Sequence, residues 1–164
     1  MDPRAVAPAE ILRSNTKLFR NCLHGMTQQQ AEGRAPSEAN SALWVAAHMV
    51  KARYGLLKWL GAERPNPLPA ALMAAKSIDD VHAWPPVADV LAAWADASHA
   101  LRDRLAAMTA AQLSTPVDVR FPVFEQTTFA LLTFMVQHDT YHLGQLSMLR
   151  KIAGLPGMSY TDPS

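Results

Sequence analysis

Cysteine is nearly absent from this 164-residue chain, since Cys22 is the only one. A single cysteine excludes both an internal disulfide and a thiolate-rich metal site. Charge is also scarce: charged residues make up 18% of the chain, and the formal net charge is +1. Binding to nucleic acid would require a basic stripe, so we expect no nucleic-acid partner.

Long apolar runs are missing as well. No segment is apolar enough to span a bilayer, and the N-terminus carries no signal sequence. We therefore expect no membrane partner and a cytoplasmic location. The length suits one domain, residues 1–164, that is large enough to bury a core. With 49% hydrophobic residues and so little charge, we expect a partner subunit to cover part of the surface.

Apolar periodicity predicts four helices joined by proline-rich connections. We expect them from Pro8 to His24, from Asn40 or Ser41 to Leu60, from Pro86 to Met108 and from Thr127 or Thr128 to Ala153. Residues 26–39 and 109–125 are expected to be irregular, and residues 62–86 to hold only a short turn at 70–75. The segment 117–124 is too interrupted by proline to anchor a sheet. The prediction is an all-α four-helix bundle.

Two histidines four residues apart, His138 and His142, lie on one face of the last helix, ~6 Å apart along its axis. A third, His48, lies in the middle of the second helix. Apolar spacing predicts that these residues face the bundle interior. Ala52 and Gly55, one and two turns after His48, would leave room for a cavity. Because unpaired buried imidazoles are costly, a shared metal ion would satisfy all three.

One other interpretation of these histidines stays open, and the sequence argues against two more. Each histidine could instead be a separate core residue bonded to a backbone carbonyl or to water. A zincin-like His-Asp-x-x-His helix would use Asp139 as its base, but only Asp162 remains downstream as a conventional third ligand. A ferritin-like di-iron site needs Glu-x-x-His pairs, and the chain has none.

The remaining polar candidates are expected to lie outside the site. His24 is expected at a helix C-terminus, His82 in the proline-rich connection and His99 on a mixed helix flank. Cys22 is interpreted as a small buried hydrophobe. Asp139 points ~100° away from His138 on a helix and is interpreted as a solvated charge. Asn15, on the first helix, is a weaker candidate for facing the cavity.

A family resemblance rests on three stretches of sequence. These are Leu43-Trp44-Val45-Ala46-Ala47-His48, then His138-x-x-x-His142-x-Gly144-Gln145-Leu146, and the ending from Leu149 to Pro156. Together they resemble the DinB-like superfamily. The resemblance implies a four-helix bundle, often a homodimer, with a divalent metal held by His48, His138 and His142. The family includes metal-dependent transferases that act with low-molecular-weight thiols and a thiol-dependent isomerase.

Three imidazoles leave at least one coordination position for water or substrate, which is typical of catalytic sites. A bound ion would lower the pKa of a water or a thiol. We therefore expect a thiol S-transferase-like or hydrolase-like enzyme acting on a small molecule; the alternative is a non-catalytic metal-binding or stress-associated interaction protein. Zinc or nickel is the expected ion, with iron or manganese also open. Gln145, one turn beyond His142, is expected to orient a ligand or substrate, or else to bond the backbone.

Overall fold

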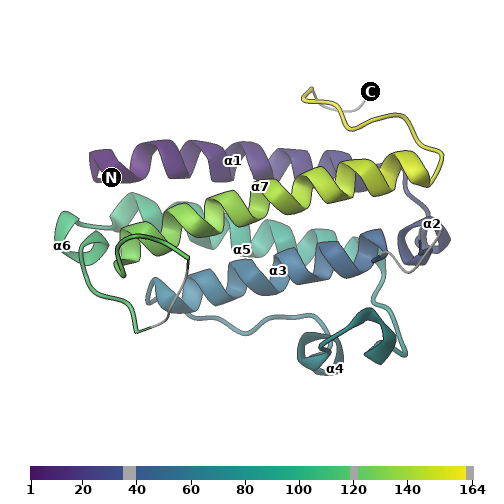
Figure 1. The fold of residues 1–164 in the computed structure, drawn as a ribbon, viewed down its shortest axis with the longest axis horizontal. Helices are drawn as coiled ribbons and strands as arrows, with labels where there is room; N and C mark the ends of the chain where they lie inside the picture. Colours follow the sequence, from purple (N-terminus) through teal and green to yellow (C-terminus); the bar gives the residue numbers. More distant parts are fainter. Residues whose placement is uncertain (35–39, 119–121, 162–164) are drawn as a thin grey trace.

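The computed structural model describes residues 1–34, 40–118 and 122–161. Four long helices form its body, namely α1 (Pro3–Leu23), α3 (Ala42–Trp59), α5 (Val87–Ala107) and α7 (Thr128–Ile152). Short helices lie between them: α2 (Gln28–Glu32), α4 (Ala70–Ala74), the 3-10 helix η1 (Ile78–Asp80) and α6 (Ala110–Leu113). Figure 1 shows the predicted all-α four-helix bundle, which is confirmed. The described residues form no strand, only an isolated bridge between Pro116 and Thr127.

The helix ends follow local capping chemistry. The Ser41 side chain accepts from the Trp44 backbone N–H at the start of α3, and Thr127 accepts from the Ala130 N–H at the start of α7. Such caps satisfy backbone donors that the first helical turn leaves unpaired. Gly61 follows α3 and Gly154 follows α7, each with a positive φ that costs glycine little. These starts and stops agree with the predicted ones within two residues.

Three details of the predicted helices were wrong. Helix α1 begins at Pro3 rather than Pro8, because Asp2 caps it by accepting from the Arg4 N–H at 2.9 Å. The two connections expected to be irregular contain α2 and α6. Both short helices begin with a threonine followed three residues later by a glutamine, and each pair forms a reciprocal capping box.

The long helices are arranged in a square in the order α1, α7, α3, α5, so that each packs against two neighbours. Figure 1 shows α1 and α7 running in one direction and α3 and α5 running in the other. Because α3 and α5 are parallel, the chain must return along the bundle between them, and residues 60–86 make this return. The returning chain places α4 against α3. The proline-rich connection therefore covers one side of the bundle.

One continuous apolar core fills the space between the four helices. At its centre the Phe19 and Trp94 rings stack with centroids 4.1 Å apart, which joins α1 to α5. Six of the buried side chains on α7 follow a spacing of 4, 3, 4, 3 and 4, namely Leu132, Val136, Asp139, Leu143, Leu146 and Arg150, and Thr128, Leu131 and Met135 are buried beside them. This spacing is the heptad pattern of a bundle seam. None of the described helices has the length and apolar character needed to cross a membrane.

Candidate metal centre

Three imidazoles meet between α3 and α7. The Nε2 atom of His138 lies 3.1 Å from that of His48 and 3.1 Å from that of His142. Ligand atoms of all three residues lie within 4.8 Å of one another. The structure thus brings together the three residues named from the sequence, in a group that could hold a metal ion.

The histidines lie at the edge of the bundle and not in its interior. His48 is exposed, whereas His138 and His142 are half-buried. The predicted seam is buried at Leu131 and Met135 but only half-buried at His138 and His142, whereas the neighbouring seam through Asp139 and Leu143 is buried. One side of the cluster is consequently open to solvent and to ligands.

The geometry of the cluster suits a transition-metal ion. In a tetrahedral site with metal–nitrogen distances of about 2.0–2.1 Å, two ligand nitrogens stand roughly 3.3 Å apart, close to the separations seen here. Among the described residues, His138 Nδ1 is buried with no hydrogen-bond partner. The polar contacts of this ring are therefore made at Nε2, which faces Nε2 of His48 and of His142. A cation bound between them would give these three nitrogens a common partner.

A hydrogen-bonded chain fixes the proton position on His142. Its Nδ1 lies 2.6 Å from Oε1 of Gln145, and the Gln145 amide donates from Nε2 to the Tyr141 hydroxyl at 3.3 Å. An amide oxygen only accepts, so Nδ1 carries the proton and Nε2 keeps its lone pair. This arrangement presents Nε2 of His142 as a ligand, as hydrogen bonds to metal-binding histidines commonly do.

Two of the imidazoles are held neutral. Partial burial lowers the pKa of His48 to about 4, and electrostatic repulsion from the neighbouring His142 and Lys51 acts in the same direction. Partial burial also lowers the pKa of His138 to about 4, with His142 and His48 contributing. At neutral pH both rings are therefore in the form that binds metals.

A cavity of about 210 Å³ borders the cluster at His48. It lies between α3 and the α4 region and is lined by Trp44, Ala47, His48, Lys51, Leu72, Met73, Ala75 and Lys76. Ala52 and Gly55, the residues expected to open a cavity, do not line this one. The space lies instead between the N-terminal half of α3 and residues 72–76 of the returning connection.

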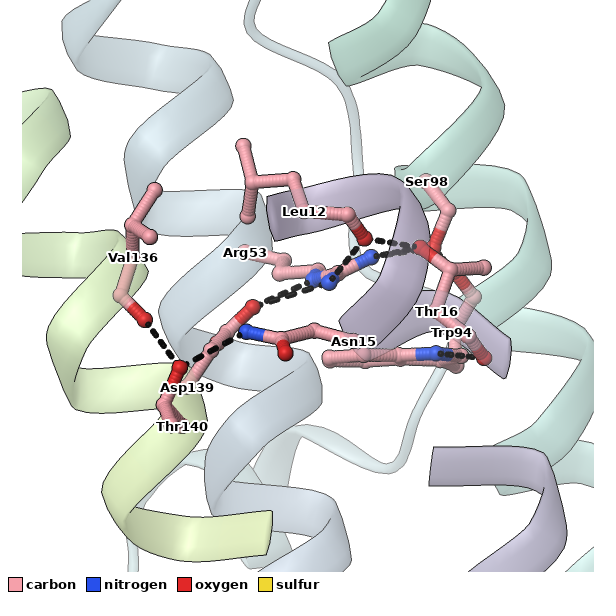
Figure 2. A network of polar contacts seen from close by, with 9 residues as sticks. All are labelled: Leu12, Asn15, Thr16, Arg53, Trp94, Ser98, Val136, Asp139 and Thr140. Carbon is pink, nitrogen blue, oxygen red and sulfur yellow. Dashed lines mark hydrogen bonds and ion pairs between the residues drawn. The ribbon is translucent and has the colours of Figure 1, made fainter. Parts of the chain in front are cut away.

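A buried ion pair lies behind the histidines. Arg53 of α3 and Asp139 of α7 are each 1% exposed, and the Nε and Nη2 atoms of Arg53 donate to one carboxylate oxygen at 3.0 and 2.8 Å. Figure 2 shows the guanidinium lying over the Trp94 ring, 3.4 Å from its centroid, and reaching Thr16 and Ser98. The pair therefore joins all four long helices.

The interpretation of Asp139 as a solvated charge is wrong. Its position between His138 and His142 in sequence points it away from their ligand atoms, and that direction leads into the core rather than to solvent. Burial raises the pKa of the Asp139 carboxyl, and the guanidinium of Arg53 opposes this rise. Because its carboxylate pairs with Arg53, Asp139 is not available as the base of a zincin-like site.

Asn15 also lies in the interior of the bundle. It is 3% exposed, and its Nδ2 donates to Thr140 Oγ1 at 3.1 Å, a contact visible in Figure 2. The bond joins α1 to α7 at residues adjacent to Thr16 and Asp139, the partners of Arg53, and Asn15 does not line the cavity beside His48. Asn15 is therefore part of the bundle's polar core.

The other candidates lie outside the cluster. His24 follows the end of α1, and His82 and His99 are exposed; none belongs to the metal-competent group. Cys22 is fully buried, as expected of a small hydrophobe, and its burial raises the pKa of the thiol to about 12. Asp162 lies outside the described residues.

Comparison with known proteins identifies the family and a solved structure of similar fold. A family model described as DinB superfamily matches residues 11–146, a span that includes all three histidines. The chain belongs to the DinB superfamily. A crystal structure titled as the conserved protein of a locus from Enterococcus faecalis is similar to this DinB chain, with a TM-score of 0.75 at 16% identity. The likeness covers 91% of this chain and 96% of that one, and it concerns the fold. A comparison with curated proteins gave no match.

Proposed function

We propose that His48, His138 and His142 bind one divalent transition-metal ion and that the chain is a metal-dependent enzyme acting on a small molecule. The observation that carries this proposal is the convergence of three Nε2 atoms at ligand spacing, without a fourth His, Cys, Asp or Glu in the same group within the described ranges. Zinc or nickel suits an all-imidazole donor set.

The open side of the cluster favours a catalytic role over a structural one. Structural zinc sites are closed by four protein ligands, whereas catalytic sites keep a position for water or substrate. A bound ion would supply Lewis acidity and lower the pKa of a water or a thiol, which suits S-transfer or hydrolysis. The protein's own part is to hold His48 and His138 neutral, to orient His142 and to offer the cavity at His48.

Metal content tests the site directly. Wild-type protein, purified without an affinity tag and loaded with zinc or nickel, is expected to retain about one ion per chain, and His142→Ala to lose most of it. His99→Ala, which removes an exposed imidazole outside the cluster, is the matched control and should retain the metal. Equal metal content in wild type and His142→Ala would contradict the three-histidine site.

Turnover separates an enzyme from a metal-binding protein without catalysis. The metal-loaded protein is to be assayed with several low-molecular-weight thiols and an electrophilic acceptor, and separately with activated esters. Activity that disappears in His142→Ala and survives in His99→Ala would support the enzyme. A loaded protein that turns over none of these would favour the non-catalytic alternative.

Gln145 is expected to tune the metal affinity through His142. Gln145→Leu keeps the size of the side chain but removes the acceptor at 2.6 Å, so the His142 ring loses the bond that fixes its proton on Nδ1. We expect the metal affinity to fall by roughly 10–100-fold, as is usual when such supporting bonds are lost. Competition with a chromogenic chelator measures the change. Gln137→Leu, on the exposed face of the same helix, is the control, and equal effects of the two changes would rule out the orienting role.

A further inference from the structure

Two lysines line the cavity beside His48, and Asp80, outside this lining, accepts from the Lys76 backbone N–H at 2.9 Å. Lys51 lies one turn after His48 on α3, and Lys76 lies after α4 on the opposite wall. No aspartate or glutamate is among the described residues that line it. The Nζ of Lys51 donates to the Met73 carbonyl at 2.5 Å, which ties the α4 segment to α3 and holds one ammonium group at the cavity.

The imidazole cluster would add to the positive charge of these lysines. Three neutral ligands leave the double charge of a bound ion uncompensated. The nearest buried acid on α7, Asp139, is already paired with Arg53 at 2.8 Å. The ion and the two lysines would therefore present positive charge to one cavity, and such a cavity concentrates anions.

The walls also restrict what can enter. A volume of about 210 Å³ accepts part of a small molecule but not a folded segment. Trp44 provides an aromatic wall, and it is shared with a second, more open cavity of about 540 Å³ that also contains Lys76. In that second cavity Arg34 pairs with Asp79 at 2.7 Å, which balances those two charges. A ligand body can thus extend over Trp44 while its charged group stays near the lysines.

We propose that the cavity between α3 and α4 binds a small organic anion, such as a carboxylate, and that Lys51 and Lys76 select for its negative charge. This inference rests on the proposed metal function and adds a substrate class to it. His48 belongs to both the cavity and the imidazole cluster, so a short molecule bound by the lysines can place a second donor group at the metal.

Cobalt-loaded protein gives a spectroscopic test that does not depend on turnover. Two probes, 3-mercaptopropionate and 2-mercaptoethanol, share a thiol that ligates cobalt and differ in the charge of the other end. We expect wild type to prefer the carboxylate probe, and Lys76→Gln to weaken its binding by about two- to fivefold at low salt while leaving the neutral probe unchanged. Titration followed by the visible cobalt bands measures both affinities, and added salt should reduce the difference.

Charge-preserving and remote variants make the test specific. Lys76→Arg should restore the preference, and Lys51→Gln should weaken it as Lys76→Gln does. Lys58→Gln, on α3 but paired with Glu63 at 3.0 Å and away from the cavity, should change nothing. Cobalt uptake with the same probe preference in wild type and Lys76→Gln would overturn the anion proposal alone. Failure to take up cobalt would overturn the metal proposal and this one with it.

Discussion

Methionine in place of Arg53 is expected to lower the free energy of unfolding by about 3–5 kcal/mol, because it leaves the Asp139 carboxylate buried without a cation. Arg53 is 1% exposed and donates twice to that carboxylate, as well as to the Thr16 and Ser98 hydroxyls. The substitution keeps an apolar stem over Trp94 but removes every one of these donors. Equilibrium urea unfolding measures the loss.

Two further variants separate the buried pair from general effects of losing an arginine. Arg13→Met removes a surface arginine that pairs with Glu10; the Arg13 and Glu10 side chains are 76% and 61% exposed. This substitution should lower the free energy of unfolding by less than about 1 kcal/mol. The double variant Arg53→Met/Asp139→Leu should recover most of the stability, since it removes the stranded acid as well. A loss in Arg53→Met no larger than that in Arg13→Met would contradict the role of the pair.

The same pair makes the stability deficit of Arg53→Met, meaning its loss of unfolding free energy relative to wild type, depend on pH. Without Arg53, burial is the largest influence left on Asp139 and raises the pKa of its carboxyl above the unfolded value, opposed only by the smaller coulombic effect of His142. A group whose pKa is raised by folding favours the native state at low pH and loses that contribution as pH rises through the folded pKa. The deficit of Arg53→Met should therefore be smaller at about pH 5 than at about pH 8.

The sequence was sufficient for the bundle because its signals are local. Apolar spacing located the four long helices, and Ser41, Thr127 and the glycines after the helices marked their ends. The spacing of His138 and His142 placed both on one face of α7. His48 required a contact across 90 residues, and only its central place in an apolar helix suggested it.

The orientation of α7 could not be read from periodicity alone. Few charged residues interrupt this helix, so two neighbouring seams are both apolar, one through His138 and His142 and the other through Asp139 and Leu143. A stronger signal was present across two helices. Arg53 on α3 and Asp139 on α7 each occupy a buried seam position among apolar residues. Opposite charges on two such seams indicate a buried pair, because neither charge is tolerated alone.

The cavity beside His48 could not be predicted from the sequence, for a different reason. Its second wall comes from residues 72–76, whose placement depends on how the connection between the parallel helices α3 and α5 crosses the bundle. Loop paths of this length carry little local signal. The four-helix pattern predicted the histidine cluster, but the connection decided which side of it receives a ligand.

Metal binding is expected to raise the melting temperature strongly, because the ion would link α3 to α7 and bind the three histidines only when the bundle is folded. At free zinc or nickel about 1,000-fold above the dissociation constant, the native state gains about 4 kcal/mol. For a domain of this size that corresponds to an increase of roughly 8–16 °C. Thermal unfolding followed by circular dichroism, with and without the metal, measures the shift.

His138→Asn is the decisive comparison, since His138 Nε2 lies within 3.1 Å of both other ligand atoms. Its melting temperature should respond to metal by less than about 2 °C, whereas His24→Asn, at the C-terminal end of α1, should respond as wild type does. An equal increase in wild type and His138→Asn would place the metal elsewhere. Removing the ion with a chelator should return wild type to its starting value, because the link between α3 and α7 is then lost while the Arg53–Asp139 pair still joins the same two helices.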